Sequence, residues 1–358
     1  MKTNPIEDES GVALVLTVFV ISLATILVVE FANTAHFDQR ISRHYSESVQ
    51  GDYILKSGLN FARILLELPK IDPSVNADWL NEPWNAVASS PALPIEGFVG
   101  EPRLGIYDED GKIDINGING LSAGGNPTGA NAGTPGAATA GQPADRGLFW
   151  KNALKEIFEL NGFVRESYKE NEFRTRGHIA LDADVQVAAI QDWIDRDTDA
   201  YSFPGFTGSG LESSSNQKMF YNRTLRSLSE LLLVPGFTRE RLERVARFIR
   251  VSPRGSGTPR VNVNTAPPEV LQALGLDSAE VSDIVEKRLQ FAYTPELVNV
   301  LVQGNDQLAN RLKTTSNEFS VLAKVEMPAS TRWLRAFVAV GGRSTGRRRS
   351  TIVRRELY

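Results

Sequence analysis

The stretch Val12–Val29, VALVLTVFVISLATILVV, contains no charged residue and no Pro or Gly. At the helical rise of 1.5 Å per residue it spans about 27 Å, close to the hydrocarbon core of a bilayer, which is roughly 30 Å thick. A backbone surrounded by lipid must satisfy its own hydrogen bonds. We therefore predict one membrane-spanning helix, to which the rest of the chain is attached.

The residues before this helix can be interpreted in three ways. A cleaved secretory signal requires a basic start and an A-x-A site, but here one Lys stands against three acidic residues and no clear A-x-A follows. A plain single-pass anchor requires no cleavage. Gly11 directly precedes the apolar run, and in this the chain resembles type IV pilins and pseudopilins, in which a dedicated peptidase cuts after that Gly. The resemblance implies a leader of residues 1–11 and a mature chain that begins at Val12.

Leu16 would be the fifth residue of that mature chain, where most pilins and pseudopilins carry Glu. A carboxylate within a membrane costs about 2.5–3.5 kcal/mol on insertion scales unless it has a partner. In that superfamily the partner is thought to be the N-terminal amine of the subunit above, so a subunit at the end of a fibre has no use for the Glu. One pseudopilin subtype, the general secretion pathway protein K family, typically lacks this Glu, and the chain resembles it here.

The helical pattern continues beyond the membrane. Apolar residues recur at helical spacing from Leu55 to Leu66, and Pro69 marks the stop. We predict that residues 12–68 form one transmembrane and spine helix, about 85 Å long at 1.5 Å per residue. Half of it would lie in the membrane and half would project outward.

Three further regions follow the spine. Residues 69–146 hold two strand patterns around the turn Asp108–Gly111, which predict a β-hairpin, and then a Gly- and Ala-rich flexible loop. Residues 147–312 are predicted to be helical, and residues 313–358 return to alternating strands. The expected helix starts lie near Leu148, Asp182, Ser227, Thr238, Pro267, Asp277 and Thr294. We therefore predict an α+β fold, in which a pilin-like long N-terminal helix packs on an antiparallel sheet and a large all-α domain is inserted before the last strands.

The helical region contains a weak repeat. Leu233–Thr238 and Ala273–Asp277 each combine a Gly that ends one helix with a residue, Thr238 or Asp277, that can cap the next. These are helix-hairpin-helix (SAM-like) units. Such units often bind DNA through a G-x-G hairpin, but neither copy has two Gly residues and the domain is acidic. Packing is the favoured interpretation, and a membrane-anchored DNA-binding or uptake protein is the alternative function.

The sequence offers little support for catalysis. The absence of Cys excludes disulfides, thiolate catalysis and Cys-bound zinc. Gly342–Gly346 matches G-x-S-x-G, but a nucleophile elbow requires a helix after it, and here an Arg-rich strand pattern follows. No second metal or triad element lies at useful spacing from the His residues, which are His36, His44 and His178. From Ser330 onward there are eight Arg and one Glu, which favours protection of an edge strand over contact with phosphate.

Three carboxylates alternate just past a predicted helix end, at Asp195, Asp197 and Asp199. Carboxylates at that end face the negative pole of the helix dipole, which is unfavourable without a cation. Calcium takes six to eight oxygen ligands, and this spacing supplies three. The pattern is not an EF-hand, because Ala200 and Phe206 stand where that loop requires Gly and Glu. The residues alone leave two interpretations open: a calcium site and a solvated acidic loop.

Further segments resemble the protein K family in the family's own order. They are YDEDGKIDING at 107–117, DWIDRDTD at 192–199, LVPGFT at 233–238 and VNVNTAPPEVL at 261–271. The last segment predicts a short strand and then Thr265 as the N-cap of a helix with Pro267 in its first turn. In the family the DWID segment and a following acidic loop bind calcium. Glu212 matches that loop, whereas Ser213 and Ser214 replace acidic residues, so the resemblance implies one calcium site that includes Glu212.

The resemblance implies a function in assembly rather than catalysis. A protein of this family is a minor pseudopilin at the tip of the type II secretion pseudopilus, where it initiates assembly and caps the fibre for protein export. The implied partners are the I-type and J-type minor pseudopilins, the H-type and major pseudopilins and the prepilin peptidase, and no nucleic acid. The implied location is the bacterial inner membrane, crossed once, with the C-terminal body in the periplasm.

Overall fold

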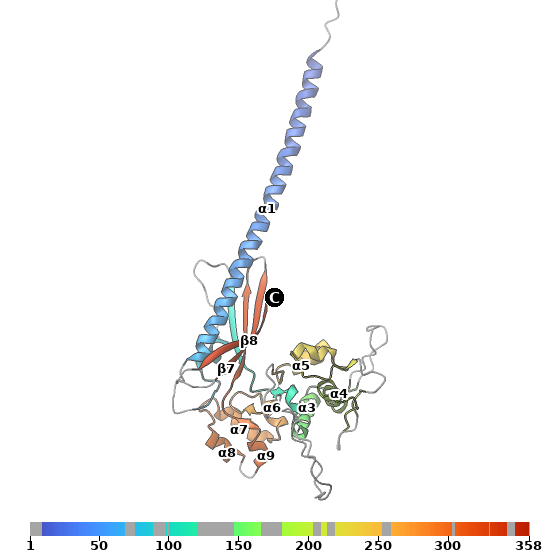
Figure 1. The fold of residues 1–358 in the computed structure, drawn as a ribbon. Helices are drawn as coiled ribbons and strands as arrows, with labels where there is room; N and C mark the ends of the chain where they lie inside the picture. Colours follow the sequence, from blue (N-terminus) through green and yellow to red (C-terminus); the bar gives the residue numbers. More distant parts are fainter. Residues whose placement is uncertain are drawn as a thin grey trace, which may run out of the picture.

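The computed structural model describes residues 9–68, 76–88, 98, 100–119, 147–165, 181–202, 209–212, 219–252, 259–302, 305–328, 330–341 and 348–357, to which the structural statements refer. Figure 1 shows one long helix, a sheet against its lower half, and a group of shorter helices beyond the sheet. This arrangement confirms the predicted α+β fold with a pilin-like N-terminal helix.

Helix α1 (Glu9–Glu67) contains 59 residues and forms the long spine in Figure 1. It matches the predicted spine helix, although it begins before Gly11. Its most apolar 18-residue window has a mean hydropathy of 3.0, and none of that window is buried within the protein. The helix is therefore long and apolar enough to cross a membrane, while its C-terminal third packs on the sheet.

The sheet is antiparallel throughout and has the order β1-β6-β7-β8. Its strands are β1 (Glu101–Asp108), β6 (Glu318–Glu326), β7 (Thr331–Gly341) and β8 (Arg349–Leu357). Because side chains alternate between the two faces of a strand, every second residue of β6 and β7 is buried against α1. This first core contains Leu55, Leu59, Ala62, Leu66, Phe319, Val321, Ala323, Leu334, Ala336 and Val338. Helix α2 (Pro83–Ala88) adds Trp84, whose ring meets Phe319 edge-on at 5.3 Å.

The β-hairpin predicted around Asp108–Gly111 is wrong. Strand β1 pairs with β6, which is more than 200 residues away, and β2 (Ile113–Asp114) pairs in parallel with β3 (Ile249–Arg250). The turn carries the chain from the sheet into the helical domain. Turn chemistry specifies that the chain reverses locally, but it does not specify which strand the next segment pairs with.

The helical domain has its own core and begins earlier than residue 147. Ile113, together with Ile115 and Ile118 of η1 (Ile115–Asn119), is fully buried in that core. The other elements of the domain are α3 (Leu148–Leu160), α4 (Ala183–Ile194), η3 (Leu228–Leu233), α5 (Arg239–Val245), β4 (Val261–Asn262), α6 (Pro268–Ala273), α7 (Ser278–Lys287), α8 (Pro295–Leu301), α9 (Asp306–Ala309) and β5 (Leu312–Lys313). Strands β4 and β5 pair in parallel.

The helix caps explain why these short helices begin and end where they do. The Asp277 side chain accepts from the backbone N–H of Glu280 in a capping box at α7, and Thr238 caps α5. Gly236 and Gly275, with φ of 87° and 98°, supply the left-handed turns before these helices. The predicted N-cap at Thr265 is wrong: α6 is preceded by Pro267, and the Thr265 hydroxyl donates instead to Asp108.

Some sequence predictions fall outside the described residues. They concern the loop between residues 120 and 146, the G-x-S-x-G match at 342–346 and His178. Both His36 and His44 lie on the exposed surface of α1.

Candidate functional site

Helix α4 ends directly before the carboxylate segment and fixes where that segment starts. Its N-cap is Asp182, which accepts from the backbone N–H of Val185 at 2.9 Å, and all of its residues except Val185 are buried. The indole of Trp193 meets Tyr221 edge-on, with a centroid distance of 5.0 Å. Because nearly all of its residues are buried, the helix has a fixed position, and the residues after Ile194 leave it in a defined direction.

Asp192 folds the acidic loop back onto the end of α4. One carboxylate oxygen accepts from the N–H of Tyr201 at 2.7 Å, and the other accepts from Leu211 at 2.5 Å and Glu212 at 2.9 Å. The Asp192 side chain is fully buried, and burial raises its pKa. A Cβ at Gly210 would overlap this carboxylate, so only Gly fits there. These contacts bring Glu212 beside the end of the helix.

Asp195 and Glu212 are buried carboxylates, with 6% and 2% of their surface exposed. Burial and the negative charge of Asp197 together raise the pKa of Asp195 to about 7. Burial, and then the charges of Asp192, Asp197 and Asp199, also raise the pKa of Glu212. The charged forms are therefore unfavourable here, and a bound cation would stabilise them.

Several oxygen atoms at this place have no hydrogen-bond donor among the described residues. They are Oδ1 of Asp195, Oε2 of Glu212, Oε1 of Gln191 and Oδ1 of Asn222. Gln191 and Asp195 also line an open pocket of about 480 Å³, together with Asp197 and the basic residues Lys151 and Arg196. Buried acceptors without donors are costly, whereas calcium binds carboxylate and amide oxygens. The chemistry of these groups therefore fits calcium.

The structure brings the predicted ligands together only in part. Asp195, Asp197 and Glu212 act on one another electrostatically, while Asp199 is exposed and its N–H donates to Asp197 at 3.1 Å. In the described ranges, no group of three or more His, Cys, Asp or Glu side chains lies close enough together to hold a metal ion. The predicted carboxylate ligands therefore lie near one another but do not surround a common point.

Sequence reasoning missed Gln191 and Asn222. Gln191 lies four residues before Asp195, one turn earlier on the same helix face, so its spacing was a readable signal. Asn222 carries no such signal, because it reaches the loop only through tertiary folding. It donates to the carbonyl oxygen of Asp197 at 2.7 Å and to Glu212 at 3.1 Å.

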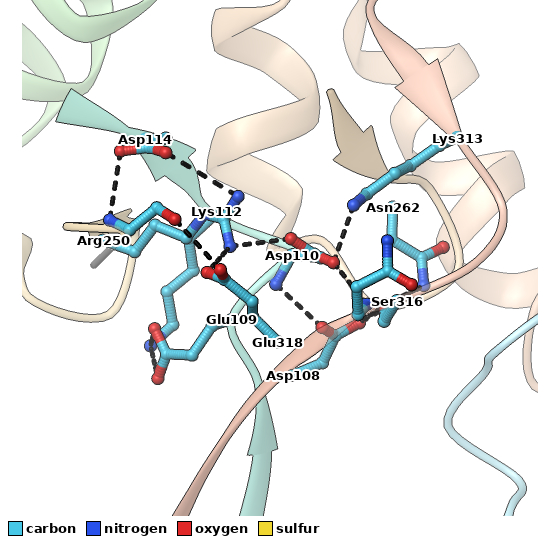
Figure 2. A network of polar contacts seen from close by, with 12 residues as sticks. Asp108, Glu109, Asp110, Lys112, Asp114, Arg250, Asn262, Lys313, Ser316 and Glu318 are labelled. Atoms are coloured by element: carbon cyan, nitrogen blue, oxygen red, sulfur yellow. Dashed lines mark hydrogen bonds and ion pairs between the residues drawn. The ribbon is translucent and has the colours of Figure 1, made fainter. Parts of the chain in front are cut away.

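The segment at 107–117 forms a second polar cluster, the junction network, between the sheet and the helical domain (Figure 2). Asp110 pairs with Arg250 and with Lys313, each at 2.7 Å, and Arg250 also pairs with Glu318 at 2.7 Å. Burial opposes ionisation of Asp110, but Arg250 and Lys313 outweigh it and hold its pKa below the usual value. The paired charges make this cluster a structural joint.

Asp108 is the acceptor at the centre of the junction network (Figure 2). Its Oδ2 accepts from the hydroxyls of Thr265 and Ser316, each at 2.5 Å, and from the amide of Asn262 at 3.2 Å. Burial and the neighbouring Asp110 raise the pKa of Asp108 to about 6. Asn262 thus joins β4 of the helical domain to the last residue of β1.

The proposed processing residues lie within the described part of α1. Val12 and Leu16 are 72% and 63% exposed, and apart from the neighbouring turns of α1 no described atom would lie within 4 Å of a Cβ at Gly11. Within the described residues, this end of the helix is therefore exposed.

Two comparisons with known proteins show what the chain is similar to. The family model for type II secretion system protein K matches residues 171–254, which include α4 and the carboxylate segment. No curated protein matches the chain. Among solved structures, a chain in the crystal structure of the GspK-GspI-GspJ complex from the enterotoxigenic Escherichia coli type 2 secretion system is 15% identical, with a TM-score of 0.55. The alignment covers 88% of this chain and 99% of that chain.

The two comparisons concern different properties. The match of residues 171–254 is one of sequence, while the similarity to the solved chain, at 15% identity, is one of fold. The sequence match is to the family that the segments at 107–117, 192–199 and 261–271 resemble. The resemblance is thereby confirmed: the chain is similar to type II secretion system protein K in residues 171–254 and has the fold of a chain of the GspK-GspI-GspJ complex over most of its length.

Proposed function

We propose that this protein is a minor pseudopilin at the tip of a type II secretion pseudopilus, where it initiates assembly and caps the fibre for protein export. The observation that carries the proposal is the placement of a large second domain beyond the sheet of a pilin-like fold (Figure 1). A fibre built from stacked α1 helices has room for a sheet around each helix. A second domain of this size is accommodated most easily where no subunit follows.

Two features support the terminal position. Leu16 leaves the membrane segment of α1 without a carboxylate, so the helix has no group to pair with the amine of a subunit above. The apolar end of α1 is fully exposed, as expected of a helix that packs against lipid or against other subunits. We infer that I-type and J-type pseudopilins pack beside this helix, since the solved complex of similar fold contains GspI and GspJ.

The proposal includes the wider setting of such a subunit. The helix anchors the protein in the bacterial inner membrane, with the body in the periplasm, and a prepilin peptidase removes residues 1–11. The H-type and major pseudopilins follow in the fibre. The role is assembly and not catalysis. The hairpin at Gly236 supports packing over DNA binding, because it lies against Leu181 and Gln186 and is not presented to solvent.

Co-purification from membranes tests the tip proposal. The full-length protein, extracted in mild detergent, should bring down the I-type and J-type pseudopilins, and deletion of its gene should abolish export through the system. Normal export in the deletion strain, or binding of duplex DNA without binding of pseudopilins, would contradict the proposal.

We also propose that Asp195, Asp197, Asp199 and Glu212 hold one calcium ion. The support is the pair of buried carboxylates, Asp195 and Glu212, each of which has one oxygen with no donor among the described residues. Calcium would offset their mutual repulsion and tie the loop at 209–212 to the end of α4. Calorimetric titration of the chelator-treated protein with calcium chloride tests this, and no heat of binding together with an unchanged melting temperature would contradict it.

A further inference from the structure

A small pocket lies where strands β7 and β8 of the sheet meet η3 and β3 of the helical domain. Four arginines contribute to its lining, Arg226, Arg250, Arg335 and Arg354, and Glu109 is the one acid among the described lining residues. We call this place the arginine pocket. Positive charge gathered in a hollow attracts negatively charged groups.

The side chains of Arg335 and Arg354 meet at the ring of Phe337, which also lines the pocket. The Cζ atoms of the two arginines lie 4.9 Å and 5.3 Å from the centre of that ring. Because side chains alternate along β7, and Ala336 and Val338 belong to the core beneath α1, Phe337 lies on the opposite face of the sheet. The arginine pocket is therefore on the side of the body that faces away from the spine helix.

Two of the four arginines are already paired with carboxylates of the protein itself. Arg250 pairs with acids of the junction network, and Arg354 pairs with a neighbouring acid of β8. Arg226 and Arg335, in contrast, form no ion pair within the described residues. The charge of these two side chains is available to a ligand.

Glu109 does not neutralise this charge, because it has other partners. Its two carboxylate oxygens accept from Lys112 at 3.0 Å and 2.9 Å, and Oε1 also accepts from the hydroxyl of Ser320 at 2.5 Å. Burial opposes ionisation of Glu109, but Lys112, Ser320 and Arg335 outweigh it and hold its pKa below the usual value. Glu109 is thus ionised and paired, and it limits the pocket without filling it.

Arg250 adds a buried donor to the same lining. The residue is 6% exposed, and its Nη1 donates to Glu318 at 2.7 Å. Its Nε is buried and has no acceptor among the described residues. A buried donor of this kind is costly, and an oxygen atom within reach would satisfy it.

The size of the pocket restricts the kind of anion. The enclosed space measures about 10 Å³, which is room for little more than one water molecule. This favours a single carboxylate group over a nucleotide or another large anion. Leu228 and Phe337, which are half-buried at the same place, offer apolar contact to the methylene groups that carry such a carboxylate.

We infer that the arginine pocket receives the carboxylate of an acidic side chain from a partner polypeptide, which Arg226 and Arg335 hold from the two sides of the pocket. The carboxylate gives both arginines the ion pair that they lack within the described residues. Because Arg335 belongs to β7 and Arg226 precedes η3, the bound segment bridges the sheet and the helical domain. This contact surface is separate from α1, along which the other pseudopilins are proposed to pack.

Calorimetric titration of the full-length protein in mild detergent tests the inference, with the acetylated and amidated peptide Gly-Glu-Glu-Gly as the probe. We expect this peptide to bind, and the matching peptide Gly-Gln-Gln-Gly to give no heat of binding. Arg335→Gln removes the charge and keeps a polar side chain, so the affinity for the acidic peptide should fall about tenfold or more. Arg335→Lys should retain part of it. Arg103→Gln is the matched control, since this arginine lies on the same face of the sheet, is 60% exposed and pairs with Glu101.

Equal affinity of Arg335→Gln and the unsubstituted protein for the acidic peptide, or no binding by either, would overturn the inference. If sodium acetate binds as tightly as the peptide, the pocket is a site for free anions and the polypeptide partner is wrong. If Arg335→Gln does not fold, Arg226→Gln decides, because Arg226 lies on the exposed surface. None of these outcomes affects the tip proposal, which is tested by co-purification with the other pseudopilins.

Discussion

Asp192 shows how one buried residue organises a site without being one of its ligands. Its carboxylate accepts three backbone N–H groups, from Tyr201, Leu211 and Glu212. Without these hydrogen bonds the loop would not be held against the end of α4, and Glu212 would not be placed near Asp195. Asp195 and Asp108 are buried carboxyl groups with raised pKa values, so substitutions there should have the clearest effects.

Asp195→Ala and Asp197→Ala should each destabilise the protein in calcium and have little effect in chelator. Each substitution removes an oxygen ligand, but it also removes one of the negative charges that repel one another when no cation is present. A ligand present at 100 times its dissociation constant stabilises the folded state by about 2.7 kcal/mol, and most of that should be lost. Thermal melts of the chelator-treated and calcium-loaded protein measure both effects.

Asp283→Ala serves as the control, because this carboxylate is half exposed and its ion pair within the described residues is with Lys287 on its own helix. It should leave the effect of calcium unchanged. If the unsubstituted protein melts at the same temperature in calcium and in chelator, the acidic segment is a solvated surface loop and binds no calcium.

Leu16→Glu should impair the terminal role of the subunit while membrane insertion persists. A carboxylate at this depth costs about 2.5–3.5 kcal/mol unless it finds a partner, and a tip subunit has no amine above it. Recovery of the tip complex and export should both fall. Leu16→Met, which stays apolar, should behave as the unsubstituted protein. Normal co-purification and export with Glu at this position would show that the missing carboxylate is incidental.

Asp108→Asn tests the junction network through pH. Burial and Asp110 raise the pKa of Asp108 from its ordinary 3.8 to about 6, despite the hydroxyl donors and nearby Lys313. The folded protein therefore binds more protons than the unfolded chain between those values, so stability from this group is present at low pH and is lost as pH rises through about 6. The Asn variant cannot take up this proton. In the unsubstituted protein the backbone N–H of Asp110 donates to the Asp108 carboxylate, and the NH2 group of Asn would compete with that donor.

Urea unfolding at about pH 5 and about pH 7.5 measures the difference. The variant should be less stable by about 1–3 kcal/mol, the usual result of leaving a buried group unsatisfied. The deficit should be larger at the lower pH. An equal deficit at both values would show that Asp108 keeps an ordinary pKa in the folded protein.

At the scale of elements, α1 combines two environments in one unbroken helix. None of its apolar N-terminal window is buried by the described residues, while Leu55, Leu59, Ala62 and Leu66 are buried against the sheet. The period of the apolar residues changes accordingly, from a continuous run to a one-sided stripe.

We predict that the mature protein begins at Val12. The polar leader ends in Gly11, and the residues on both sides of this bond are exposed among the described residues. The intact mass of the protein purified from its native membrane should correspond to residues 12–358. A mass that retains residues 1–11 would leave the helix as a plain anchor. Gly11→Leu, which changes only the residue before the bond, should give the uncleaved mass.

At the scale of the whole molecule, two separate cores are joined by a polar joint. The first core lies between α1 and the sheet, and the second fills the helical domain. Between them Arg250 is 6% exposed and pairs with Asp110 and Glu318. A buried charged joint has a preferred geometry, so we expect the helical domain to move with the sheet as one body.

Arg250→Leu should uncouple the two parts. It leaves Asp110 and Glu318 without their main counter-charge, and removal of one partner from a buried ion pair typically costs about 3–5 kcal/mol. Hydrogen exchange should accelerate at Asn262, whose N–H donates to the carbonyl oxygen of Asp110, and at Ile113, whose N–H donates to Phe248 near Arg250.

The amides that pair β6 with β7 should exchange as before, because the first core does not include Arg250. Arg247→Leu is the matched control, since this arginine lies three residues away and is 70% exposed. Unchanged exchange in Arg250→Leu would mean that apolar contacts hold the domains together without the ion pairs.

The sequence by itself determined what depends on near neighbours. The length of the apolar run specified a helix long enough to cross a membrane, the caps at Thr238 and Asp277 specified where two helices begin, and alternation specified the last strands. Each of these signals is complete within a few turns or a few residues, because hydrogen bonds in a helix and side-chain alternation in a strand are local.

Only the tertiary structure decided which distant groups meet. It paired β1 with β6 in place of a hairpin, assigned Thr265 to Asp108 in place of a helix cap, and brought Asn222 to the oxygens of Asp197 and Glu212. Strand partners and buried acceptors are chosen by competition among all segments for burial and for hydrogen bonds. The outcome depends on all segments of the chain at once, so a local stretch of sequence does not predict it.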